Sequence, residues 1–282
     1  MTQTIRTDTA LADYKTQMEL EEKAPATIEK YLRDVQTFLS FLPEGGELTR
    51  ETVLQYKRSL EKTHRAASTN SMLAALNSFL AFLHREDCRV QLLKIQRPCF
   101  RDSERELTKQ EYERLVQAAK SKKNERLYLL LQTICSTGIR VSEHRFITAE
   151  ALSAGPIRVM NKGRERTIFL PDELRGVLAQ YCKRKGIASG PVFVTRTGKP
   201  LNRCNIWSEM KTLCRSAGVD DRKVYPHNLR HLFAVTYYRM EKDIVHLADI
   251  LGHASVETTR IYTATCSDEC ARALSRMKLL LC

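Results

Sequence analysis

Apolar residues recur at helical spacing along most of the chain. Between residues 9 and 41 they form two runs that break at Ala24-Pro25, where a proline suits the first turn of a helix. A third run extends over about 49–62, and a fourth begins near Ser68. Four amphipathic helices of this kind can bury one small core, so the pattern predicts an N-terminal helical domain.

The helical pattern lapses between residues 94 and 106, where Pro98 and several charges follow one another. We interpret this segment as an interdomain linker. Thr108 and Glu111 then have the spacing of a capping box and open a new helical region. The predicted boundaries are therefore a helical domain over 1–93, a linker over 94–106 and a second domain over 107–282.

A change of spacing marks a small sheet in the second domain. Short β-prone runs lie on either side of Asn161-Lys162-Gly163, which predicts a hairpin, and Val192–Thr195 is a candidate third strand. Most of the chain after Asp172 returns to the helical pattern. The expected fold class is mainly α with a small antiparallel β-sheet: four to five helices in the N-terminal domain and an α+β second domain.

The charge is strongly positive and unevenly distributed. The 282 residues carry a formal net charge of +13, whereas residues 1–95 contain 13 basic and 13 acidic side chains. The whole excess therefore lies in the C-terminal two thirds, which favours a nucleic-acid surface there. The nine cysteines form no CxxC pair, and neither a signal peptide nor an apolar run of transmembrane length is found. These features predict reduced thiols in the cytoplasm, no membrane contact and no metal site.

Arg140 is the first candidate for phosphate chemistry. It follows the glycine that ends one predicted helix and precedes the start of the next. Backbone N–H groups and a guanidinium at a helix start form a natural anion site. The alternative is a surface ion pair with Glu143, three residues further on.

The other candidates are individually more typical of structural roles. His227 and Arg230 lie three residues apart at the start of a predicted helix, which is also the pattern of a solvated helix face. His253 follows a predicted helix end and could equally cap it. Tyr262 alone is most often a core or surface tyrosine, and Lys162 at a hairpin tip is most often solvated.

Taken together, in their order and spacing, these residues resemble the active-site signature of the tyrosine recombinases, also called the phage integrase family. The motifs at 137–143 and 229–234 are close to the family pattern, and the resemblance covers nearly the whole chain. It is nearest to Xer-like recombinases and small integrases. The resemblance implies a SAM-like core-binding domain over 1–93 and a catalytic domain over 107–282 with a C-terminal tail helix.

The resemblance also implies a function: a site-specific recombinase that cuts and rejoins DNA through a covalent 3′-phosphotyrosyl intermediate, in integration, excision or dimer resolution, without cofactor or metal. Tyr262 is the expected nucleophile, and His227 the expected base. The hairpin is one residue shorter than the family pattern, so either Lys162 or Arg164 is the expected acid for the leaving group. The predicted catalytic residues are Arg140, Lys162, His227, Arg230, His253 and Tyr262.

Double-stranded DNA is the expected partner. We expect a monomer in the absence of DNA and a homo-tetramer on it, near the nucleoid, with an accessory recombination factor as a further partner. The apolar stretch 271–281 is expected either to dock on a neighbouring protomer or to close its own core. A type IB topoisomerase and a catalytically silent DNA-binding protein are the alternative functions. The predicted DNA-binding residues are Lys57, Arg58, Lys62, Arg65, Thr69, Asn70 and Arg164.

Overall fold

The computed structural model describes the chain apart from residues 1–6, 44–46, 96–102, 162–163, 263–274 and 277–282. The chain divides into two compact units, Met1–Arg97 and Pro98–Cys282. None of the helices in the described part is long and apolar enough to cross a membrane.

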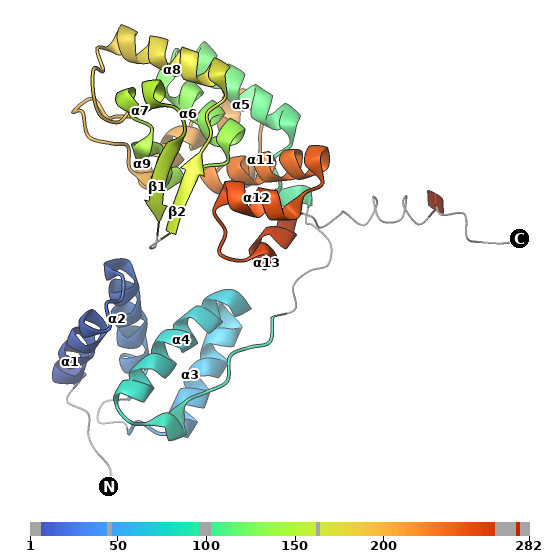
Figure 1. The fold of residues 1–282 in the computed structure, drawn as a ribbon. Coiled ribbons are helices and arrows are strands. Elements are labelled where there is room, and N and C mark those ends of the chain that lie inside the picture. Colours follow the sequence, from blue (N-terminus) through green and yellow to red (C-terminus); the bar gives the residue numbers. More distant parts are fainter. Residues whose placement is uncertain (1–6, 44–46, 96–102, 162–163, 263–274, 277–282) are drawn as a thin grey trace, which may run out of the picture. The chain divides into compact units, whose positions relative to one another are not determined.

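The N-terminal unit is a small helical bundle (Figure 1). Pro25 occupies the first turn of its second helix, and the hydroxyl of Thr49 caps the third by accepting a hydrogen bond from the Thr52 N–H at 3.2 Å. Phe38 and Tyr56 meet edge to face in the core, with ring centroids 5.1 Å apart. The elements are α1 (Thr7–Leu20), α2 (Pro25–Leu39), α3 (Arg50–Thr63), α4 (Ala66–Phe82) and the 3-10 turn η1 (Glu86–Cys88).

The second unit has the predicted capping box at the start of its first α-helix, where Thr108 and Glu111 exchange hydrogen bonds of 2.8 and 3.1 Å. Its elements are η2 (Ser103–Arg105), α5 (Lys109–Ser121), α6 (Glu125–Thr137), η3 (Val141–Phe146), α7 (Ala149–Ala154), β1 (Ile157–Asn161), β2 (Arg164–Ile168), α8 (Asp172–Lys185), α9 (Arg203–Lys211), α10 (Cys214–Ala217), η4 (Asp221–Lys223), α11 (Pro226–Glu241), α12 (Ile244–Leu251), α13 (Val256–Thr259) and η5 (Arg260–Tyr262). The predicted fold class, mainly helical with a small antiparallel sheet, is confirmed.

The sheet consists of β1 and β2 among the described residues, paired antiparallel from Ile157 opposite Ile168 to Asn161 opposite Arg164. The predicted third strand at Val192–Thr195 was wrong. It forms only an isolated bridge, Val194 to Pro200, because the chain turns back at once through a Thr195 N–H to Lys199 O hydrogen bond of 2.7 Å. Pro200 lacks the N–H that a continuing ladder needs.

Gly138 ends α6 in the left-handed conformation, at φ +62°, directly beside α11. A Cβ atom here would lie 2.3 Å from the Phe233 ring. Gly186 ends α8 with φ +67° but has open space around it. Substitutions at the two glycines therefore separate the cost of placing a side chain on a left-handed backbone from the cost of the close contact with Phe233.

Gly138→Ala is expected to lower the free energy of unfolding by about 2–4 kcal/mol, of which roughly 1–2 is the left-handed backbone and the rest the displaced ring. Urea denaturation measures this loss. Gly186→Ala is the matched control and is expected to lose only the backbone part. Equal losses in the two variants would show that the close approach of α11 to Gly138 costs nothing.

Candidate active site

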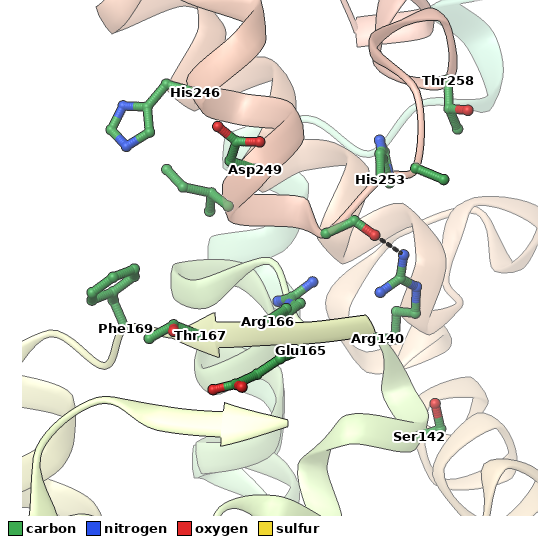
Figure 2. Close-up of a pocket in the computed structure, with 13 residues that line it drawn as sticks. Arg140, Ser142, Glu165, Arg166, Thr167, Phe169, His246, Asp249, His253 and Thr258 are labelled. Atoms are coloured by element: carbon green, nitrogen blue, oxygen red, sulfur yellow. Dashed lines mark hydrogen bonds between the residues drawn. The ribbon is translucent and has the colours of Figure 1, made fainter. Parts of the chain in front are cut away.

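Three arginines from distant parts of the chain meet at the C-terminal end of α12, and Figure 2 shows two of them, Arg140 and Arg166. The Leu251 carbonyl accepts from Arg230 Nη2 at 2.7 Å and also from Arg166 Nη1. The Gly252 carbonyl accepts from Arg140 Nη2 at 2.9 Å. The last carbonyls of a helix lack partners within the helix and carry partial negative charge. They therefore orient the three guanidinium groups before any ligand binds.

Arg140 lies at the N-cap of η3 and makes the ion pair with Glu143 that the sequence offered as an alternative. The pair is not on the surface. Arg140 Nη1 and its backbone N–H donate to the two carboxylate oxygens at 3.0 and 2.8 Å, and the Glu143 side chain is only 2% exposed. Burial pushes the Glu143 pKa upward, but the charge of Arg166 and the bonds from Arg140 outweigh it, so the pKa is lowered. The Arg140 side chain remains 33% exposed and can reach a ligand.

Arg230, in the second turn of α11, is buried at 2% exposure. Its Nη1 also donates to the Gly138 carbonyl at 2.6 Å, so it ties the end of α6 to the end of α12. Burial, followed by the charges of Arg140 and Arg166, lowers its pKa to about 10, and the group stays charged at neutral pH. Three guanidinium groups thus face one carboxylate, which leaves a net positive site suited to an anion.

His253 follows Gly252 and contacts the cluster through Nε2, 3.1 Å from Arg230 Nη2. A guanidinium can only donate, so Nε2 is the acceptor and the proton is on Nδ1, which donates to Thr259 Oγ1 at 2.8 Å. Burial and the neighbouring arginines lower the His253 pKa to about 4. The imidazole is therefore neutral at pH 7, and without DNA it accepts rather than donates toward the cluster.

Acidification is expected to destabilise the fold through this group. The folded-state pKa of His253 is about 4, against the ordinary 6.5, so the unfolded chain binds more protons between these values. The contribution to stability is present above about pH 6.5 and is lost as the pH falls to about 4. His253→Gln is expected to flatten part of the fall in melting temperature over this range, whereas His64→Gln, an exposed histidine of the N-terminal unit, leaves it unchanged. An unaltered slope in His253→Gln would contradict this assignment.

Tyr262 is buried at the end of η5 between two histidine rings. The His231 ring meets it edge to face at a centroid distance of 5.1 Å, and the His253 ring stacks on it at 6.1 Å. Burial raises the Tyr262 pKa, and the charge and hydrogen bond of Arg230 oppose this without overcoming it. The phenol therefore keeps its proton at neutral pH and needs a base in order to attack.

His227 is exposed in the first turn of α11. Desolvation by the surrounding protein lowers the His227 pKa, and the charges of Arg230, Arg203 and Arg140 lower it further. A neutral imidazole in this position can accept a proton. Direct contacts bring four of the six predicted catalytic residues together at the end of α12, namely Arg140, Arg230, His253 and Tyr262, and His227 lies about one helical turn before Arg230 on α11. Lys162 lies outside the described residues.

The predicted DNA-binding residues have different surroundings. Arg58, Lys62 and Arg65 are exposed near the junction of α3 and α4, and Lys57 is half-buried, with Nζ 2.8 Å from the Gln91 carbonyl. Arg164 begins β2, where its backbone pairs with Asn161.

Thr69 and Asn70 require a correction. Thr69 is fully buried, with Oγ1 3.5 Å from the Leu60 carbonyl. The Asn70 amide bonds the Leu93 backbone in both directions, at 2.8 and 2.7 Å. These side chains hold α4 against the rest of its unit, so the predicted surface reduces to the basic residues.

Arg166 is the main residue that sequence reasoning missed. It lies on β2 two residues before the buried Ile168, so the two side chains are on the same face of the sheet, and it is opposite the buried Val159. Arg166 is only 7% exposed although it is charged. A charged residue in phase with apolar ones on a strand is the signal that could have revealed it. The burial of Glu143 beside Arg140 and the contact of Thr259 with His253 are likewise not predicted by the sequence pattern.

A cleft of about 1120 Å³ opens beside the arginine cluster, between β2 and α12 (Figure 2). Arg140, Arg166 and His253 are among its lining residues, and the partly exposed Arg140 offers donors that a phosphate group can reach. Among the described residues, no group of three or more histidine, cysteine or acidic side chains is placed to hold a metal ion.

Comparison with known sequences identifies both units. The model of the phage integrase family matches residues 105–268, and that of the phage integrase N-terminal SAM-like domain matches residues 11–87. The chain belongs to the phage integrase family. It is a tyrosine recombinase, a site-specific DNA recombinase of the class that acts through a phosphotyrosyl intermediate, which confirms the predicted family and function class.

Relatives cover nearly the whole chain. Tyrosine recombinase XerA of Pyrococcus furiosus is 32% identical over 98% of this chain and 96% of its own length. Tyrosine recombinase XerD of Halalkalibacterium halodurans is 30% identical over 84% of this chain and 86% of its own. The fold matches a crystal structure of a lambda integrase tetramer bound to a Holliday junction, with a TM-score of 0.74 and 18% identity over 92% of this chain and 77% of that one.

Proposed function

We propose that Arg140, Arg230 and His253 bind the scissile phosphate of a DNA recombination site and that Tyr262 attacks it. The observation that carries this proposal is the convergence of the first three side chains on the end of α12, with the Tyr262 ring stacked on His253. The guanidinium groups stabilise the added charge of the pentacoordinate transition state more than that of the diester.

In this step one phosphorus–oxygen bond forms and one breaks. The Tyr262 oxygen forms a bond to phosphorus as the bond to the 5′-oxygen breaks, His227 accepts the phenolic proton, and the 5′-oxygen leaves as a hydroxyl. Lys162 or Arg164 supplies the leaving-group proton. The bond energy is retained in the phosphotyrosyl link, so a 5′-hydroxyl of another duplex reverses the step without ATP.

His253 changes its role when the phosphate arrives. In the DNA-free chain Nε2 accepts from Arg230. A bound phosphate adds negative charge, which favours the imidazolium and raises the His253 pKa. The protonated ring then donates Nε2–H to a phosphate oxygen while Nδ1–H keeps its bond to Thr259.

We further propose that the protein works as a homo-tetramer on DNA in the cytoplasm, in integration, excision or dimer resolution, with an accessory factor as an additional partner. The support is its similarity to XerA and XerD and to the fold of a lambda integrase tetramer on a Holliday junction. The stretch 271–281, which we expect to dock on a neighbouring protomer or to close its own core, lies largely outside the described residues.

Two assays test the function. A nicked suicide substrate that carries the recombination site is expected to give an SDS-resistant protein–DNA adduct in the presence of EDTA. Strand exchange between two sites then separates a recombinase from the alternatives. A supercoiled plasmid that is relaxed without any exchange would show a type IB topoisomerase, and binding without an adduct would show a catalytically silent protein.

The basic residues near the α3–α4 junction are proposed to contact DNA phosphates. Reversing both Arg58 and Lys62 to Glu is expected to weaken DNA binding and to reduce the slope of log affinity against log salt by about 1.8, since each phosphate contact contributes about 0.9. Fluorescence anisotropy over a salt series measures this. Lys15→Glu on α1 is the control for a general loss of charge. An affinity that is unchanged at every salt concentration would exclude this surface.

A further inference from the structure

Arg166 stands out because its charge is buried in an apolar layer. It projects from β2 toward the turn after α12 (Figure 2), directly opposite the buried Val159 and two residues before the buried Ile168. Its Nε is buried without a hydrogen-bond partner. Burial of a guanidinium is costly and is compensated only where the group holds good partners.

Its partners are the parts of the site that carry the reactive groups. Arg166 Nη1 donates to the Leu251 carbonyl, and its Nη2 lies 3.6 Å from Glu143 Oε2. Its Cδ leaves no room above Gly252, where a Cβ atom would lie only 2.6 Å away. Arg166 thus touches the turn that carries His253 and the carboxylate that holds Arg140.

We propose that Arg166 is a positioning residue that fixes the turn at 251–253 and Glu143 against β2, and thereby sets the placement of His253 and Arg140. This inference rests on the proposed function of the site. The Arg166 side chain is 5% exposed, and its Nη1 and Nη2 groups are directed at the Leu251 carbonyl and Glu143, so the role assigned to it is to hold these two protein groups. It differs in this respect from Arg140, which is partly exposed.

The planar fork of arginine is needed for this role. It reaches a backbone carbonyl and a carboxylate at once, whereas the single ammonium of lysine can serve only one of them at these positions. Charge is a separate contribution, since the charge of Arg166 is one of the influences that lower the His253 pKa, together with burial, Arg230, Arg140 and His227. Lysine keeps the charge and loses the fork, while methionine loses both.

The test compares Arg166→Lys and Arg166→Met on the nicked suicide substrate. Misplacement of a catalytic group by about 1 Å can cost roughly 100-fold in rate, so both variants are expected to form the adduct about 30- to 100-fold more slowly, with DNA affinity within about threefold of wild type. Arg158→Met is the matched control. Arg158 lies on β1, is 81% exposed and pairs only loosely with Glu165 at 3.5 Å.

A second readout does not depend on cleavage. In NMR titrations the His253 pKa is expected to rise in Arg166→Met and to stay low in Arg166→Lys. Gly252→Ala disturbs the same contact, because the added Cβ atom would meet the Arg166 side chain, and it is expected to slow cleavage in the same way. Gly186→Ala, with a similar φ of +67° and open space, is its control for backbone strain and is expected to cleave like wild type.

The outcomes are distinct. Folded Arg166 variants that cleave within threefold of wild type would overturn the positioning role, as would rate losses fully explained by weaker DNA binding. If the Arg166 variants do not fold, Gly252→Ala decides: slow cleavage supports the role, and a rate equal to that of Gly186→Ala overturns it. If neither wild type nor Arg158→Met forms an adduct, the proposed function fails, and the His253 titration still tests the contact.

Discussion

Replacing Tyr262 by phenylalanine is expected to abolish the covalent protein–DNA adduct while DNA binding is retained. The change removes only the hydroxyl, which supplies the attacking oxygen, and the ring still fills the space between His231 and His253. The variant is therefore expected to fold and to bind DNA like wild type. Adduct formation on the nicked substrate, read on a denaturing gel, measures the loss.

Tyr237→Phe is the matched control, because this tyrosine packs against the same apolar cluster and its hydroxyl contacts His246 Nδ1 at 2.9 Å. It is expected to form the adduct at the wild-type rate. An adduct in Tyr262→Phe, or its loss in both variants, would contradict the assignment of the nucleophile.

Arg230→Lys is expected to lower the cleavage rate by about 10²–10³-fold, the usual effect of removing a donor that stabilises the transition-state charge. One ammonium cannot serve the Gly138 and Leu251 carbonyls, His253 and a phosphate together. Each buried carbonyl that loses its donor costs roughly 1–3 kcal/mol, so the free energy of unfolding also falls.

Single-turnover cleavage and urea denaturation measure the two effects of Arg230→Lys separately. Arg239→Lys, an exposed position in the last turn of the same helix, is the control and is expected to change neither. A variant at position 230 that cleaves within tenfold of wild type would show that this fork does not contact the transition state.

Local signals in the sequence predicted most of the fold. Caps such as Thr49 and Thr108, the glycine at 138 and the proline at 226 fix where helices begin and end, because each satisfies backbone groups or φ angles that few other residues can. The predicted third strand at 192–195 does not form, because the residues that follow it prevent continued pairing. Its β-prone residues are followed by a tight turn and Pro200, which end the pairing after one bridge.

The six catalytic candidates came from a motif and not from geometry. No local pattern predicts that the carbonyls of Leu251 and Gly252 accept hydrogen bonds from three arginines, because these residues are distant in the sequence and meet only in the folded chain. Burial decided the other differences. The alternative for Arg140 was an ion pair with Glu143 on the surface, whereas the Glu143 side chain is buried. Thr69 was predicted to bind DNA and is buried within its own unit.

The central claim is that the Tyr262 oxygen takes the DNA 3′-phosphate, and the site of attachment tests it most directly. The adduct from the nicked substrate is digested with nuclease and trypsin, and its peptides are sequenced by mass spectrometry. Trypsin releases residues 261–272 as one peptide, in which Tyr262 is the sole tyrosine. We predict a nucleotide joined through its 3′-phosphate to Tyr262. Attachment to any other residue, or through a 5′-phosphate, would contradict the account.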